Sequence, residues 1–163
     1  FEPRTTLLIA YTLMGLSTIP LYLAQNMLGA LLTAAFMGIA LAGLLLMGDV
    51  TLSDVIDEDE VKTGQRREGM YFGMSGLIIT LAYALSSIVF GWISKVYGYD
   101  PLLVEQPASV ALGFRVFMSF PPAIGSLFAI LTLLFYPLHG ERLSSVKQAL
   151  KEKAETMKFG GVE

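Results

Sequence analysis

The side chains with the greatest capacity for chemistry lie in one polar stretch, residues 54–69, which reads DVIDEDEVKTGQRREG. It holds six carboxylates and three cations: Asp54, Asp57, Glu58, Asp59, Glu60 and Glu68, with Lys62, Arg66 and Arg67. Residues three or four apart share one face of a helix, and arginine pairs with a carboxylate through two parallel hydrogen bonds. The spacing therefore predicts a network of ion pairs that forms in one conformation and breaks in another.

Two other interpretations of this stretch compete with the switch. A run of charges is commonly no more than a solvated connection. As a calcium loop counted from Asp57, the stretch offers Asp59 and Glu68 at ligand positions. However, Val61 and Lys62 stand where such a loop needs an oxygen ligand and a glycine. We therefore predict no metal site here.

The switch interpretation makes a specific prediction about partners. Carboxylates at the C-terminal end of a helix oppose the helix dipole, and a carboxylate held close to lipid also loses hydration. Both effects call for nearby cations. We expect the two arginines at the start of the next helix, Arg66 and Arg67, to neutralise the carboxylates of one face, namely Asp54, Asp57 and Glu58.

The elements around this stretch are apolar. The chain is 54% hydrophobic and 15% charged, with a mean hydropathy of +0.62, whereas a soluble domain carries roughly 25% charged residues. Four segments, at about 5–24, 27–48, 70–94 and 111–138, are each long enough to cross a bilayer, which takes ~20 helical residues. The sequence predicts an all-α integral membrane helix bundle over residues 1–138, with a charged loop at 49–69.

Several function classes are disfavoured by composition. The net charge of −3 and the lack of a basic run interleaved with aromatics argue against a nucleic-acid partner. The chain has no cysteine and one histidine, so we expect neither a catalytic thiol nor an enzyme of any kind. Residue 1 is Phe and no leader pattern precedes the first span, so we expect the chain to begin inside a longer protein.

Small residues predict how the spans pack. Ala30, Ala34, Gly38 and Ala42 repeat every four residues, and Gly76, Thr80 and Ala84 form a second such row. These rows would let helix backbones approach closely in lipid, although small residues are common in such helices. In the fourth span, Arg115 either reaches back to the interface, makes a structural hydrogen bond, or contacts a substrate.

The tail, residues 139–163, differs from the spans. Leu143, Val146, Leu150 and Met157 form one stripe, and lysines surround it at Lys147, Lys151, Lys153 and Lys158. This pattern predicts an amphipathic helix that lies on a membrane surface. Lysine and arginine are concentrated in the tail and in loop 49–69, which predicts that both are cytoplasmic.

Residues 54–69 resemble the loop before the eleventh helix of the glycoside–pentoside–hexuronide:cation symporters, a melibiose symporter-like family of the major facilitator superfamily. The similarity continues through residues 97–99, 113–122 and 136–143. It implies that the four spans are helices nine to twelve of a multi-pass transporter of the cell membrane. It also implies that Asp54, Asp57, Glu60, Arg66 and Glu68 are positions of a cytoplasmic gate.

The resemblance implies cation-coupled symport of a sugar or other small solute by alternating access, with Na⁺ or H⁺ as the coupled ion and no other cofactor. Expected partners are the solute, membrane lipid and the missing N-terminal helices, where the ion site would lie. Thr80 replaces a family lysine implicated in coupling, and Leu45 replaces a tryptophan near the sugar, so both are candidate pocket-lining residues. Two alternatives remain: a transport-inactive membrane accessory or scaffold protein, and a lipid or lysolipid carrier of the same superfamily.

Overall fold

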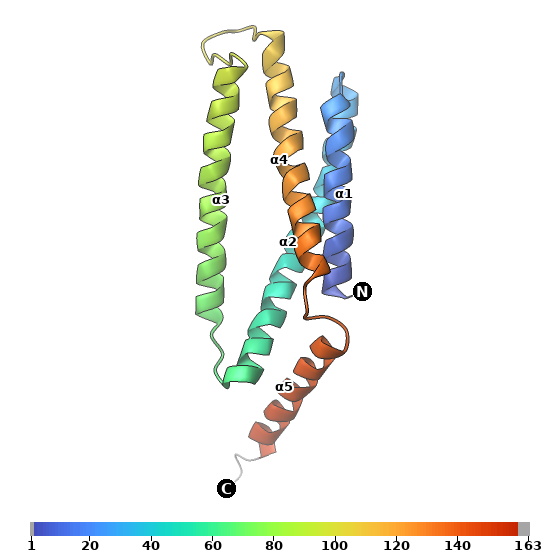
Figure 1. The fold of residues 1–163 in the computed structure, drawn as a ribbon, viewed down its shortest axis with the longest axis vertical. Coiled ribbons are helices and arrows are strands. Elements are labelled where there is room, and N and C mark those ends of the chain that lie inside the picture. The colour runs from blue at the N-terminus through green and yellow to red at the C-terminus, as the bar shows by residue number, and fades with distance from the viewer. Residues whose placement is uncertain (1, 160–163) are drawn as a thin grey trace.

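The structure, a computed structural model, describes residues 2–159, except the side chains of Ala154 and of residues 156–159. Met157 and Lys158 of the predicted tail pattern therefore lie outside the described side chains. The described part is built from helices, without strands: α1 (Pro3–Leu23), α2 (Met27–Thr63), α3 (Glu68–Val96), α4 (Ala108–Leu134) and α5 (Glu141–Phe159) (Figure 1). The first four are long and apolar enough to cross a membrane, which confirms the all-α membrane fold class.

The turn between α1 and α2 is short and well capped. Asn26 precedes α2, and its side-chain oxygen accepts a hydrogen bond of 2.7 Å from the amide of Gly29, a typical N-cap interaction. The two helices run antiparallel and pack against each other (Figure 1). Helix α1 also packs along α4, so these three helices form the main body of the bundle.

The predicted small-residue rows do not form the contacts within this chain. Ala40 of α2 is buried, and a Cβ added at Gly43 would lie 3.3 Å from the Cβ of Ala10 in α1. By contrast, Gly38 and Gly76, which belong to the predicted rows, have no neighbour within 4 Å of such a Cβ. Helix α2 therefore presents a different face to α1, and the predicted rows lie on exposed faces.

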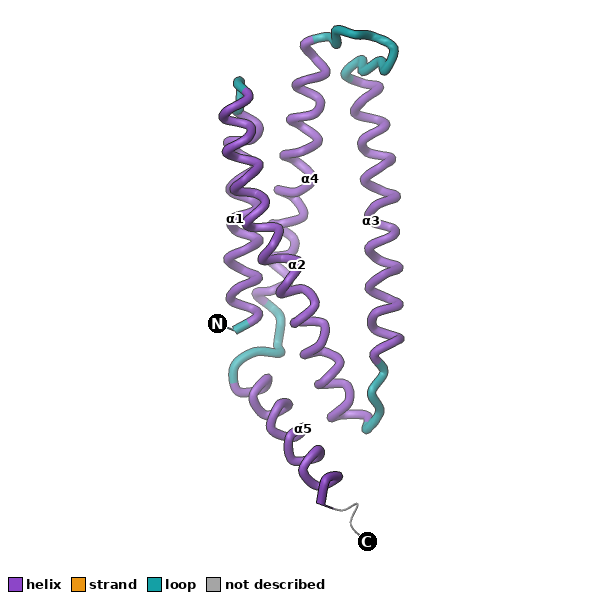
Figure 2. Tube along the Cα trace, turned by 180° about the vertical axis from the view of Figure 1, so that it is seen from behind, coloured by secondary structure: helices purple, strands orange, loops and turns teal. Residues whose placement is uncertain are grey.

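Helix α3 stands apart from the other spans (Figures 1 and 2). It contacts α4 and makes sparse contacts with α2, and Ile93 is its one buried residue. Near the connecting loop, Gly113 of α4 lies against the ring of Tyr97, and Phe114 of α4 lies against Phe90 and Tyr99. Helix α3 is thus held at its ends rather than along its length.

The fourth span begins and ends a few residues earlier than predicted, at Ala108–Leu134 instead of 111–138. Helix α4 ends at Leu134 instead of 138, because the residue before Pro137 is pushed out of the helical region. The last carbonyls are satisfied from the start of α1, where Arg4 donates from Nε to the carbonyl oxygen of Leu133 and from Nη2 to that of Leu134, both at 2.9 Å. These bonds join the N-terminal end of α1 to the C-terminal end of α4.

The two ends of the bundle differ in character. The start of α1, the α2–α3 connection and α5 lie at one end, and the α1–α2 turn and the 97–107 loop lie at the other (Figures 1 and 2). The polar stretch and the tail therefore share one end, as the sequence predicts.

Candidate functional site

The polar stretch, marked by its charge as a loop at 49–69, is mostly helix, as the helical spacing of its carboxylates indicates. Helix α2 continues beyond its apolar part, through residues 49–63, and we call residues 49–63 the α2 extension. No glycine or proline interrupts it. It ends at Gly64, whose φ of 73° suits glycine and whose amide donates to the carbonyl of Glu60 at 2.9 Å. Only residues 64–67 separate α2 from α3.

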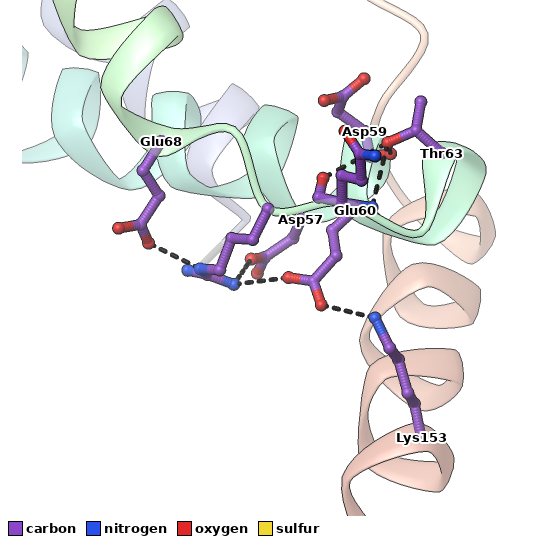
Figure 3. Close-up of polar contacts among 8 residues, drawn as sticks. Asp57, Asp59, Glu60, Thr63, Glu68 and Lys153 are labelled. Atoms are coloured by element: carbon purple, nitrogen blue, oxygen red, sulfur yellow. Dashed lines mark hydrogen bonds and ion pairs between the residues drawn. The ribbon is translucent and has the colours of Figure 1, made fainter.

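Arg66 joins the α2 extension to the start of α3. Its Nη1 lies 3.1 Å from Asp57 Oδ1 and 3.0 Å from Glu60 Oε2, and its Nε lies 2.6 Å from Glu68 Oε1. Figure 3 shows these three carboxylates converging on one guanidinium. The planar group presents donors in several directions, so one side chain holds two helices together. The carboxylates raise the pKa of Arg66, led by Glu68.

Arg67 pairs with a single carboxylate. Its Nε lies 2.9 Å from Asp59 Oδ2 and its Nη2 lies 2.5 Å from Asp59 Oδ1, the two-point geometry that suits arginine. The hydrogen bond from Arg67 lowers the pKa of Asp59, and Asp59 raises the pKa of Arg67 in turn. This pair is a second link between α2 and the start of α3.

Helix α5 supplies cations that the sequence-based partner assignment missed. Lys147 Nζ lies 3.0 Å from Asp54 Oδ1, and Arg142 Nη2 lies 2.6 Å from Glu58 Oε1. The prediction that Arg66 and Arg67 neutralise Asp54 and Glu58 is therefore wrong, although Asp57 does pair with Arg66. The signal for these contacts was the row of cations beside the apolar stripe of the tail, which had been interpreted as facing lipid.

Two carboxylates are shared between cations. Glu58 also accepts from Lys62, one helical turn away at 2.9 Å. Glu60 accepts from Lys153 of α5 at 2.8 Å as well as from Arg66 (Figure 3). Hydrogen bonds from Lys62 and Arg142 lower the pKa of Glu58, against the opposing effect of burial, and those from Lys153 and Arg66 lower the pKa of Glu60. Both carboxylates are therefore ionised at neutral pH.

The apolar stripe of the tail is covered by this chain. Leu143 and Val146 of α5 are buried together with Leu138, and Val55 of the α2 extension and Tyr136 pack against them. Apolar packing and ion pairs hold α5 on the α2 extension. That α5 also binds a membrane surface stays a prediction.

The two candidate pocket residues lie on different surfaces. Leu45 lines an open hollow of about 410 Å³ between α2 and α3, with Gly48, Ser75 and Ile79 among its neighbours. Thr80 lies on an exposed part of α3, where its hydroxyl donates to the carbonyl of Gly76 at 2.8 Å. A pocket-lining role for both residues stays a prediction.

Two further sequence expectations concern isolated groups. Arg115 is half-buried and lines a hollow with Gln25 and Asn26, at the end of the bundle away from the α2 extension. This position agrees with an interfacial arginine. Within the described residues, no group of three or more histidine, aspartate or glutamate side chains is arranged to hold a metal ion.

Comparison with known proteins identifies relatives by sequence. The chain is 27% identical over 128 residues to an uncharacterized symporter of Synechocystis, an alignment that covers 75% of this chain and 23% of that protein. The chain thus spans about a quarter of the length of this relative. No solved structure matches the chain. A family model described as MFS/sugar transport protein matches residues 2–140, which is most of the chain, and the chain therefore belongs to this family of membrane transport proteins.

Proposed function

We propose that the chain is part of a secondary active transporter that carries a sugar or another small solute by cation-coupled symport. Its family supports transport, and a relative named as a symporter supports coupling. The observation that carries the proposal is the ion-pair network of the α2 extension. Five of the six carboxylates of the α2 extension, those from Asp54 to Glu60, are paired with cations from the α2–α3 connection, α5 or α2 itself.

The arrangement of these ion pairs suits a gate that opens and closes. Helix α3 touches α2 sparsely along the span, so Arg66 and Arg67 are the main links between the two helices at this end. When α3 moves away from the α2 extension, these pairs break and their charges become hydrated. Exposed ion pairs are weak because water competes for them. The network can therefore open and close repeatedly, which alternating access requires.

The orientation follows from the same residues. The network and α5 lie at the end that is rich in lysine and arginine, so we place this end in the cytoplasm of a cell membrane protein. The coupled ion, Na⁺ or H⁺, and most contacts with the solute belong to the helices that precede this chain in the longer protein. Leu45 and Thr80 would face the solute only where those helices complete a pocket.

The test is gradient-driven uptake by the full-length protein in proteoliposomes. A panel of radiolabelled sugars and a labelled lysophospholipid is offered under an imposed Na⁺ or H⁺ gradient, and accumulation is compared with that after the gradient is collapsed. We expect one sugar or related solute to accumulate only with the gradient. Accumulation of no solute would favour a scaffold, and movement of the lysophospholipid alone would favour a lipid carrier.

A further inference from the structure

Helix α5 separates its charges by sign. At about 100° per residue, the apolar stripe of Leu143, Val146 and Leu150 occupies one face. Cations flank this stripe on both sides, at Arg142, Lys147, Lys151 and Lys153, and the carboxylates fall on the opposite face, at Glu141, Glu152 and Glu155. An apolar stripe bordered by cations is the pattern of a helix that binds an anionic bilayer surface.

In the structure the same face is engaged by protein. Leu143 and Val146 are buried against residues of this chain, and Arg142, Lys147 and Lys153 pair with the carboxylates of the α2 extension. The α2 extension therefore offers what an anionic surface would offer, namely an apolar patch bordered by negative charge. One face of α5 therefore suits two binding surfaces, the α2 extension and an anionic bilayer. It can bind only one of them at a time.

The cations of α5 remain accessible to lipid while α5 is bound to the α2 extension. The side chains of Arg142, Lys147 and Lys153 are 47%, 50% and 36% exposed in their ion pairs, so water and lipid phosphates can reach them. Six residues separate the end of the apolar helix α4 from the start of α5, so α5 begins close to where a membrane surface would lie. The match to the family model ends at residue 140, so α5 lies outside the matched residues.

We propose that an anionic lipid surface competes with the α2 extension for α5. When the bilayer is rich in anionic lipid, α5 leaves the α2 extension and binds the surface with the same stripe and the same cations. The departure removes Lys153 from Glu60 and Arg142 from Glu58, and so leaves Arg66 and Lys62 as the partners of these carboxylates. The proposed binding of α5 to lipid does not depend on the proposed transport function. The effect of that binding on the gate rests on the transport function.

The experiment measures the distance between α5 and the α2 extension in the full-length protein. Spin labels are attached at Ser53→Cys and Gln148→Cys, two exposed positions on the two helices, after any other cysteines have been replaced. The protein is placed in nanodiscs of phosphatidylcholine, and in nanodiscs that also contain phosphatidylglycerol at about one lipid in three. Pulsed electron spin resonance then gives the distance distribution in each.

We expect one short distance in phosphatidylcholine and a second, longer distance in the anionic nanodiscs, with a several-fold rise in its population. Neutralising the carboxylates with Asp54→Asn, Glu58→Gln and Glu60→Gln should increase it. The matched control Lys95→Gln, at the other end of the bundle, should leave it unchanged.

Two results would overturn the proposal. A single short distance in both nanodiscs would mean that α5 is a permanent part of the bundle. A longer component that is equally populated in both would mean that α5 moves without regard to anionic lipid. Neither result depends on whether solute is transported, so a failure of this proposal is distinguishable from a failure of the symport proposal.

Discussion

Lys147 of α5 and Asp54 of the α2 extension form an ion pair of 3.0 Å in which the aspartate is only 5% exposed. Of the carboxylates in the α2 extension, Asp54 is the one that is buried. Burying a carboxylate without a partner is costly, so this lysine satisfies a requirement that the extension itself cannot meet. The pair ties the tail to the end of α2.

The first prediction concerns this pair. We expect Asp54→Asn and Lys147→Gln each to lower the midpoint of thermal denaturation in detergent, and the double variant to lose less than the sum of both. The coupling free energy should be about 1 kcal/mol, since the lysine is half exposed. Lys151→Gln, a neighbouring exposed cation of α5, is the control and should have little effect. Strict additivity would show that the two residues do not interact.

The second prediction concerns Arg66, which contacts three carboxylates. Arg66→Gln should reduce the initial rate of solute uptake by about tenfold and leave membrane insertion intact, because the closed arrangement loses its main link. Arg66→Lys should keep part of the rate, since an ammonium keeps the charge but lacks the arginine fork. Gln65→Ala on the same connection should match the wild type. A wild-type rate for Arg66→Gln would remove this residue from the gate.

The third prediction concerns pH. The ion pairs lower the pKa of Glu58 and of Glu60 below the usual value of 4.5. Their contribution to stability is therefore fully present above about pH 4.5 and is lost as the pH falls through the lowered pKa values. The distance between spin labels on α2 and α5 in neutral nanodiscs should be constant from neutral pH to about pH 5. It should lengthen in more acidic solution, and lengthening already near neutral pH would contradict this account.

The fourth prediction concerns the end of α3 that lies away from the α2 extension. A Cβ added at Gly113 would lie 2.7 Å from Cγ and 2.8 Å from Cβ of Tyr97, so Gly113→Ala should overpack the contact between α4 and α3 at a cost of about 1–3 kcal/mol. Gly125→Ala in the same helix is the matched control, because nothing lies within 4 Å of its added Cβ. Thermal denaturation of both variants checks this, and equal midpoints would show that the contact has room.

The sequence predicts elements well where the signal is local. The apolar lengths indicate four spans. They place the end of the second span at residue 48, whereas α2 continues to Thr63 and ends at the left-handed Gly64. The end of α4 is not a matter of apolar length alone, which extends to residue 138, because Pro137 ends the helix earlier. Gly38 has no neighbour within 4 Å of an added Cβ, so the close helix packing expected of its small-residue row stays a prediction for helices outside this chain.

The sequence predicts which residues form the ion-pair network, but it predicts only some of the pairs. Arg66 lies a few residues from Asp57 and Glu60, so proximity in sequence suffices to predict these contacts. Lys147 is far from Asp54 along the chain, and its pairing depends on how α5 packs. An amphipathic helix buries its stripe equally well in protein or in lipid, so its pattern cannot choose between the two.

The central claim is that the links between the α2 extension and the start of α3 must open during transport. The chain contains no cysteine, so Asp59→Cys and Arg67→Cys can be introduced together in a full-length protein without other cysteines and joined by a short reducible crosslinker. The measurement is gradient-driven uptake before crosslinking, after it and after reduction. We predict that uptake is abolished by the crosslink and recovers on reduction, whereas unchanged uptake by fully crosslinked protein would contradict the claim.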